Sequence, residues 1–144
     1  MEPLPSAVDR HQKEWNKHNA DKVAETYAEA STYQDPFLPQ PLKGRAAVQQ
    51  YLRGLFATFP DFEVRFLKTI VSGNMVVQIN TAGGTMKGPS RTPEGRTIPA
   101  TNKRFSGEYA VVFELGKDSK ILSLKIYGDS LAASAFKQLG LPSP

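Results

Sequence analysis

The 144-residue sequence contains no cysteine, which excludes disulfide bonds, thiolate metal sites and a cysteine nucleophile. Its two histidines, His11 and His18, lie seven residues apart with no clustered carboxylates beside them. A zinc or iron site needs further convergent ligands, so we expect no metal and no cofactor. The sequence also lacks a G-x-S-x-G turn and a glycine-rich phosphate loop ending in G-K-[ST].

Long apolar runs are absent as well. No segment approaches the roughly 18–20 apolar residues of a membrane span, and the first residues show neither the basic nor the apolar region of a secretory signal. We therefore expect a soluble, cytoplasmic protein with no membrane partner. Hydrophobic residues make up 40% and charged residues 22% of the chain, as in ordinary globular proteins. The length suits one domain, 1–144, with one core.

The formal net charge is only +4, but basic residues gather in one segment. Two interpretations remain open: a solvated surface loop, or a pocket mouth that attracts an anionic substrate or a carrier phosphate. No basic stripe alternates with stacking aromatic residues, so a nucleic-acid partner is not expected. The segment runs between Lys87 and Arg104 and contains Lys87, Arg91, Arg96, Lys103 and Arg104 against the single acid Glu94.

Helical patterns occupy the first part of the chain. Ser6 and Asp9 have the spacing of a capping box, which predicts a helix start. Residues 19–21 break this helix, and a second short helix is predicted to run to about Ala30. The clearest pattern covers Arg45–Phe59. Its apolar positions follow the helical period, and they are Val48, Tyr51, Leu52, Leu55, Phe56 and Phe59.

Strand patterns dominate the second part. Helices before a run of strands at hairpin spacing predict an α+β fold with helices on one face of a curved antiparallel sheet. Such a sheet encloses a pocket between its concave face and the helices. The predicted strands are Ser31–Asp35, a strand over 62–66 and beyond, Met75–Met86, about Asn102–Leu115 and Ile121–Tyr127, followed by a short helix over Ser130–Leu139.

Two aspartates at strand ends are candidate bases. Asp35 precedes Pro36, and a carboxylate facing a cavity there would be desolvated and raised in pKa. The alternative is an Asp-Pro turn in which the side chain accepts backbone N–H groups. Asp129 lies between the last strand and the terminal helix, where it could be a base or a helix N-cap.

Further candidates could bind or orient a ligand. His11 and Trp15 lie one turn apart and could present an imidazole and an indole to the same pocket, His11 as a third candidate catalytic residue. Tyrosine hydroxyls could donate to a developing oxyanion. The predicted substrate-binding residues are Trp15, Tyr33, Tyr51, Phe56, Tyr109, Val111, Leu124 and Ile126.

Several segments together resemble one known superfamily. They are Trp15 with 19–21 and 27–28; Asp35-Pro36 followed by Gly44-Arg45; 59–61; 99–103; and 127–129 leading to 137–140. In this order they resemble the NTF2-like (cystatin-like) fold, and within it the SnoaL-like polyketide cyclases. The resemblance implies a cone-shaped sheet with three N-terminal helices over one pocket, a homodimer, and a cofactor-free aldol ring closure. In that chemistry Asp129 would remove a proton beside a carbonyl.

The segment from Tyr33 to Phe37 is also similar to ketosteroid isomerases, which implies Asp35 as the proton-shuttling base. Two features differ: His11 replaces the oxyanion-binding tyrosine, and Val111 stands where a neutral acid is expected. With half of that oxyanion site missing, the substrate should stabilise its own anion. We therefore expect a small, largely apolar carbonyl compound.

Two other functions remain open. An epoxide hydrolase or dehydratase of this fold would need paired carboxylates with an arginine, which the sequence does not reveal. A small-molecule-binding module without catalysis would have an apolar pocket, with Asp35 and Asp129 turned to solvent or used as caps.

Overall fold

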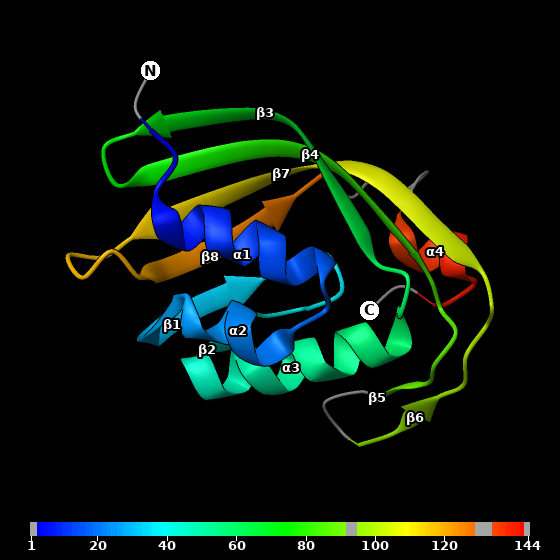
Figure 1. The fold of residues 1–144 in the computed structure, drawn as a ribbon. Coiled ribbons are helices and arrows are strands. Elements are labelled where there is room, and N and C mark those ends of the chain that lie inside the picture. Colours follow the sequence, from blue (N-terminus) through cyan, green and yellow to red (C-terminus); the bar gives the residue numbers. More distant parts are fainter. Residues whose placement is uncertain (1–2, 92–94, 129–133, 143–144) are drawn as a thin grey trace.

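The computed structural model describes residues 3–91, 95–128 and 134–142. It has a strongly curved six-stranded sheet with helices against one face, as predicted for this α+β fold (Figure 1). In Figure 1, β3, β4 and β7 arch over α1, while α3 lies beneath α2 and β1. The elements are α1 (Ser6–Asn16), α2 (Ala20–Glu25), β1 (Tyr27–Gln34), β2 (Leu42–Lys43), α3 (Arg45–Thr58), β3 (Glu63–Ser72), β4 (Met75–Thr85), β5 (Ser90–Arg91), β6 (Thr97–Ile98), β7 (Arg104–Leu115), β8 (Ile121–Tyr127) and α4 (Ala135–Leu139).

The large sheet has the strand order β2-β1-β8-β7-β4-β3. Its neighbours are antiparallel except for β1 and β8, which run parallel. The prediction of a wholly antiparallel sheet therefore needs this correction. The parallel pair joins the first strand of the chain to the last one described, and a parallel pair requires a long connection of this kind.

The second helix is shorter than predicted. It ends at Glu25, and Tyr27 to Ala30 belong to β1 rather than to the helix. The backbone N–H of Ile121 donates to the Thr26 carbonyl at 2.9 Å, and Tyr27 is aligned with Ile121 in the sheet. Pairing with β8, a contact distant in sequence, outweighs the helical preference of Ala28, Glu29 and Ala30, because tertiary contacts override local propensity.

The helix over Arg45–Thr58 follows the prediction closely. Gly44 precedes it with φ of 95°, a backbone conformation that favours glycine. Four positions of the predicted apolar stripe are buried: Val48, Leu52, Leu55 and Phe56. Phe59 is also buried, as the residue that ends the helix. This face of α3 is part of the core.

The predicted capping box of α1 is wrong, although the helix begins at Ser6. Pro5 occupies the N-cap position, and no side-chain cap is formed. Asp9 instead accepts a hydrogen bond from Lys13 Nζ at 2.9 Å, one turn along the helix. Because Pro5 precedes the helix directly, Ser6 lies inside the first turn rather than at its cap.

The short helix α4 covers one end of β7. Ser134 caps it by accepting a hydrogen bond from the Lys137 N–H at 3.2 Å, and Gly140 ends it in the left-handed region. The Gln138 side chain pairs with both backbone groups of Ser106, at 2.8 and 2.9 Å. Part of the predicted helix, residues 130–133, lies outside the described residues.

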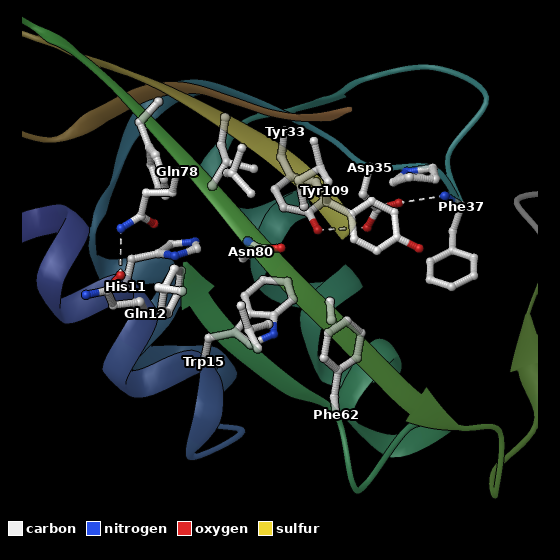
Figure 2. Close-up of a pocket in the computed structure, with 18 of the residues that line it drawn as sticks. His11, Gln12, Trp15, Tyr33, Asp35, Phe37, Phe62, Gln78, Asn80 and Tyr109 are labelled. Atoms are coloured by element: carbon white, nitrogen blue, oxygen red, sulfur yellow. Dashed lines mark hydrogen bonds between the residues drawn. The ribbon is translucent and has the colours of Figure 1, made fainter. Parts of the chain in front are cut away.

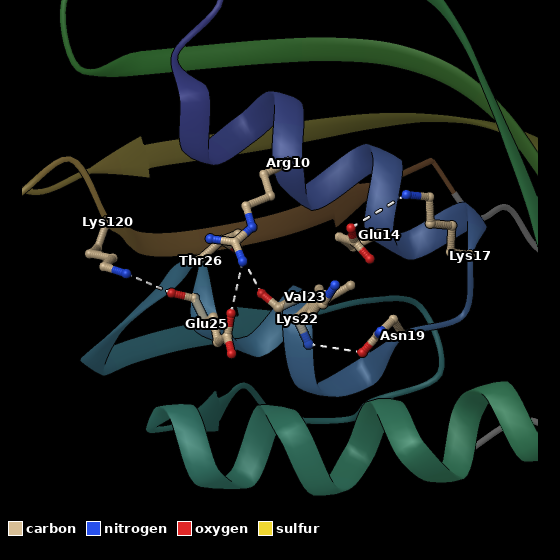
Figure 3. A network of polar contacts seen from close by, with 9 residues as sticks. All are labelled: Arg10, Glu14, Lys17, Asn19, Lys22, Val23, Glu25, Thr26 and Lys120. Carbon is tan, nitrogen blue, oxygen red and sulfur yellow. Dashed lines mark hydrogen bonds and ion pairs between the residues drawn. The ribbon is translucent and has the colours of Figure 1, made fainter.

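An exposed polar network joins the outer surfaces of the helices to the sheet (Figure 3). Arg10 of α1 pairs with Glu25 of α2 at 2.9 Å, and both side chains are more than half exposed. Lys120, in the turn before β8, donates to the Glu25 carbonyl at 2.8 Å. This network ties three elements together on the side facing solvent.

No helix in the described part of the chain combines the length and apolar character needed to cross a bilayer.

Candidate active site

A largely apolar pocket lies between the concave face of the sheet and α1, with α4 at one end. Its empty volume is about 660 Å³, solvent at the mouth included. Figure 2 shows side chains of α1, β1, β4 and β7 converging on this space. Much of its wall is aromatic, from Phe37, Phe62, Phe66, Phe105 and Phe113. A concave apolar site with a few placed polar groups is the usual form of a small-molecule site.

Asp35 brings a carboxylate into this pocket from the end of β1. The residue is 5% exposed, and Pro36 turns the chain away directly after it. Its Oδ2 accepts hydrogen bonds from the hydroxyls of Tyr33 and Tyr51, each at 2.7 Å. Its Oδ1 accepts the Phe37 N–H at 2.9 Å. Both predicted features, the Asp-Pro turn and a carboxylate facing the cavity, therefore occur in the same side chain.

Burial raises the pKa of Asp35 above its ordinary value, because desolvation disfavours the charged form. The hydrogen bonds from Tyr51, Tyr33 and the backbone oppose this effect by stabilising the carboxylate. Burial, with the nearby Asp35 charge, also raises the pKa of both tyrosines well above 10. The two phenols therefore remain neutral hydrogen-bond donors.

His11 and Trp15 lie side by side on the pocket face of α1. Their rings stack with centroids 5.6 Å apart, and His11 Nε2 lies 2.9 Å from the Tyr27 hydroxyl. Burial lowers the pKa of His11 to about 3. A neutral imidazole suits the orienting role considered above, but it would not exchange protons near pH 7. The indole Nε1 of Trp15 is buried without a partner among the described residues.

The structure brings most of the predicted site residues together. Two predicted binding residues do not line the pocket. The Tyr51 hydroxyl donates to Asp35 from α3, and the ring of Phe56 packs edge-on against that of Trp15 with centroids 5.2 Å apart. Asp129 lies outside the described residues. The predicted residues that do line the pocket are His11, Trp15, Tyr33, Asp35, Tyr109, Val111, Leu124 and Ile126.

Sequence reasoning missed a polar strip on the wall, formed by Gln12 of α1 with Gln78 and Asn80 of β4. Gln78 and Asn80 are 1% and 4% exposed. The signal was present in the strand period, because both share the inward register with the buried Val76. Two amides at the inward positions of one strand are unusual, since buried side chains are mostly apolar.

The basic segment does not form the pocket wall. None of Lys87, Arg91, Arg96, Lys103 and Arg104 is among the lining residues. Arg104 instead pairs with Asp61 at 3.3 Å on the surface. Within the described ranges, no three histidine, aspartate or glutamate side chains gather as metal ligands. Asp35 is the one carboxylate among the described lining residues.

Comparison with solved structures places the chain in a well-populated fold. A protein from Jannaschia sp. CCS1, described provisionally as a SnoaL-like polyketide cyclase, is 20% identical with a TM-score of 0.78, each chain covering 99% of the other. A Catenulispora acidiphila protein of ketosteroid isomerase-like fold, solved with trimethylamine, is 22% identical with a TM-score of 0.75 over 98% and 97% of the chains. An M. tuberculosis LEH-like epoxide hydrolase is 19% identical with a TM-score of 0.69 over 94% and 87%.

At these identities the structural matches establish the fold and leave the reaction open. No match is found among curated proteins. The sequence profile of the SnoaL-like domain matches residues 8–124, which include every described lining residue except Ile126 and Ala135. The chain belongs to the SnoaL-like domain family of the NTF2-like superfamily.

Proposed function

We propose that this protein is a cofactor-independent enzyme in which Asp35 removes a proton alpha to a carbonyl of a small, largely apolar compound. One observation carries the proposal: a buried carboxylate of raised pKa faces a mostly apolar pocket. A base whose pKa is brought nearer to the working pH transfers protons more efficiently. The reaction would be of the cyclase or isomerase type, with intramolecular aldol closure of a polyketide as its leading form.

The hydrogen bonds of Asp35 indicate which oxygen would act. A carboxylate has about four acceptor positions, and the phenols of Tyr33 and Tyr51 occupy two of them on Oδ2. The Phe37 N–H takes one on Oδ1. Oδ1 accepts one of these hydrogen bonds against two on Oδ2, and the Leu38 N–H also stabilises the carboxylate. We take Oδ1 as the atom that would receive the proton. The two phenols would hold the carboxyl group in place while its charge changes.

The developing enolate needs stabilisation as well. Trp15 Nε1 is an N–H donor without a partner in the described residues, so it is available for one hydrogen bond. Removal of one oxyanion donor costs about 3–4 kcal/mol in enzymes that depend on it. A site with few such donors favours substrates whose enolate is delocalised into an aromatic or second carbonyl group.

The alternatives find less support in the described pocket. An epoxide hydrolase or dehydratase with paired carboxylates and an arginine would need charged groups that the described lining residues lack, since Asp35 is their one carboxylate. In a binding module without catalysis, Asp35 would serve only its turn and its hydrogen bonds with the tyrosines, and the raised pKa of its carboxyl group would have no use. Asp129 remains a predicted second base and belongs in the same test.

The test follows exchange of the alpha protons of 2-tetralone in D₂O by NMR, because its enolate is conjugated with the ring. The wild-type protein should exceed the buffer rate, and Asp35→Asn should lower the catalysed rate about a hundredfold or more. The catalysed rate should also fall as the pH drops through the raised pKa of Asp35. The exposed Asp21→Asn serves as the matched control and should keep the full rate.

Two outcomes would contradict this assignment. One is a wild-type rate equal to that of buffer. The other is full activity in Asp35→Asn, which together with loss in Asp129→Asn would move the base to Asp129. Circular dichroism and thermal unfolding of each variant separate loss of chemistry from loss of fold.

The assembly state and location also remain proposals. Leu67 and Ile70 on β3 and Tyr127 on β8 are large apolar side chains with about half of their surface exposed. Such exposure is compatible with the predicted homodimer, a soluble pair of chains in the cytoplasm. The mass in solution, measured by sedimentation, decides between one chain and two.

A further inference from the structure

Two buried amides on the pocket wall have oxygen atoms that no group in the described part of the chain satisfies. Gln78 Oε1 and Asn80 Oδ1 accept no hydrogen bond from the described residues, although both residues are at least 96% buried. A buried acceptor without a partner is costly, and most such groups in folded proteins are paired. Both amides line the same pocket as Asp35. An acceptor left open in a ligand pocket points to a ligand that fills it.

The Gln78 amide is also held in place. Its Nε2 donates to Gln12 Oε1 at 2.8 Å and to Thr69 Oγ1 at 3.2 Å. Figure 2 shows the first of these bonds, between α1 and β4. Two partners on one nitrogen restrict rotation of the amide, so its open oxygen is fixed relative to the pocket. A preorganised acceptor loses little freedom when a ligand binds.

The sheet register places Gln78 well away from Asp35. Gln78 is aligned with Val111, which is aligned with Ile126. Gln34 is aligned with Lys125, which puts Asp35 beside Ile126. Gln78 and Asp35 are therefore separated by three strand spacings, which amount to about 14 Å along the sheet. In the view of Figure 2, Gln78 lies toward one side, Asp35 toward the other and Asn80 between them.

We propose that Gln78 and Asn80 form a second binding subsite, which takes a hydroxyl group at the end of the substrate remote from its acidic C–H. A hydroxyl can donate to an amide oxygen and accept from an amide nitrogen, so it satisfies either group. A carboxylate would meet two acceptor oxygens there and no cation among the described lining residues. The apolar floor of Val111 and Ile126 between the two ends suits a ring system.

The substrate class is therefore an elongated, mostly apolar ketone with a hydroxyl group far from the carbonyl. The position of the ketone at the Asp35 end rests on the function proposed above. The hydroxyl preference does not depend on it, because the subsite would recognise the same group in a molecule that is bound and not converted.

The experiment compares two ketones that differ only in this group, 2-tetralone and 6-hydroxy-2-tetralone. Trp15 is the single tryptophan of the chain and lines the pocket, so quenching of its fluorescence reports binding of either. The wild-type protein should bind the hydroxylated ketone about tenfold more tightly, as expected for one well-formed hydrogen bond. Asn80→Leu and Gln78→Met should lower this ratio to about twofold or less, through weaker binding of the hydroxylated ketone.

Gln34→Met is the matched control, because it removes a glutamine amide that does not line the pocket. It should keep the tenfold preference. Asn80→Leu is the decisive variant if Gln78→Met is poorly folded, since Asn80 Oδ1 accepts no hydrogen bond from the described residues. Replacing an unpaired buried amide by an apolar group of similar shape should preserve the melting temperature or raise it.

Three results would overturn the subsite: equal binding of the two ketones by the wild type, a preference that survives in both variants, or no quenching by either ketone. Asp35→Asn separates this proposal from the proposed reaction. If the hydroxyl preference persists in Asp35→Asn while exchange is lost, both hold. If Asp35→Asn keeps its exchange activity, the reaction assignment fails and the subsite stands on the binding ratio alone.

Discussion

Asp35 and Asp21 receive similar numbers of hydrogen bonds and yet behave in opposite ways. Asp21, on the outer surface of α2, accepts from Gln49 Nε2 at 2.9 Å and from Arg53 Nε and Nη2 at 3.0 and 2.8 Å. These hydrogen bonds, with the charge of Arg53, lower its pKa. Asp35 accepts from two phenols and from the backbone N–H groups of the turn after it, but its burial raises the pKa.

The difference shows that the surroundings, rather than the count of hydrogen bonds, decide what a carboxylate can do. Water already solvates Asp21, so added donors only favour its charged form further. Inside the pocket, no cation among the described lining residues offsets the loss of water around Asp35. The same contrast separates the pocket from the exposed network of α1, α2 and the turn before β8 (Figure 3), which contains Arg10 and Glu25.

The largest expected effect on stability comes from the buried imidazole in the pocket. His11 has its pKa lowered to about 3, below the ordinary value of 6.5, so between these pH values the unfolded chain binds a proton that the folded chain does not. Stability should therefore fall by about 1.4 kcal/mol per pH unit as the pH drops from 6.5 toward 3. Urea unfolding at a series of pH values measures this slope.

His11→Gln should remove most of that acid-dependent loss, because glutamine does not titrate. His18→Gln is the matched control and should keep the loss. An unchanged slope in His11→Gln would show that other groups cause the acid sensitivity.

A smaller effect should follow when a donor to Asp35 is removed. Tyr51→Phe deletes one of the two phenols on Oδ2, and hydrogen bonds to charged groups contribute about 1.5–3 kcal/mol. The loss of stability should be full at pH 7 and smaller below the pKa of Asp35, where the carboxyl group is protonated. The acid limb of the exchange activity should also move to higher pH, because the carboxylate loses a stabilising donor.

Denaturant unfolding at pH 7 and at low pH, with the pH profile of exchange, checks both parts of this prediction. Tyr127→Phe is the companion variant, a tyrosine on β8 with about half of its surface exposed. A loss of stability equal at both pH values would mean that Tyr51 acts through packing and not through the carboxylate.

The smallest effect should come from the outer network. Arg10→Met removes an ion pair with Glu25 whose two side chains are 53% and 57% exposed. Exposed pairs contribute below about 1 kcal/mol and are screened by salt. Thermal unfolding should show a small loss at low ionic strength that disappears in 1 M NaCl, with the exchange activity unaltered. A large loss of stability that persists in 1 M NaCl would contradict the expected difference between the buried pocket and the exposed network.

The periodicity of the chain determined much of this architecture in advance. The apolar stripe of Arg45–Thr58 and the alternation of Arg104–Leu115 follow directly from the repeat of a helix and of a strand. The aspartate before Pro36 and the stacked pair His11 and Trp15 were also evident, because local spacing places them at a strand end and on one helix face.

Tertiary structure alone decided the rest, since it depends on contacts between residues far apart in the chain. Pairing with β8 turned Tyr27 into the start of a strand, and the fold brought Tyr51 of α3 to the carboxylate of Asp35. It also buried Gln78 and Asn80, which local pattern could place inward without showing that their amide oxygens lack a partner among the described residues. Burial, which sets both the pKa of Asp35 and the cost of an open amide, is a property of the assembled core.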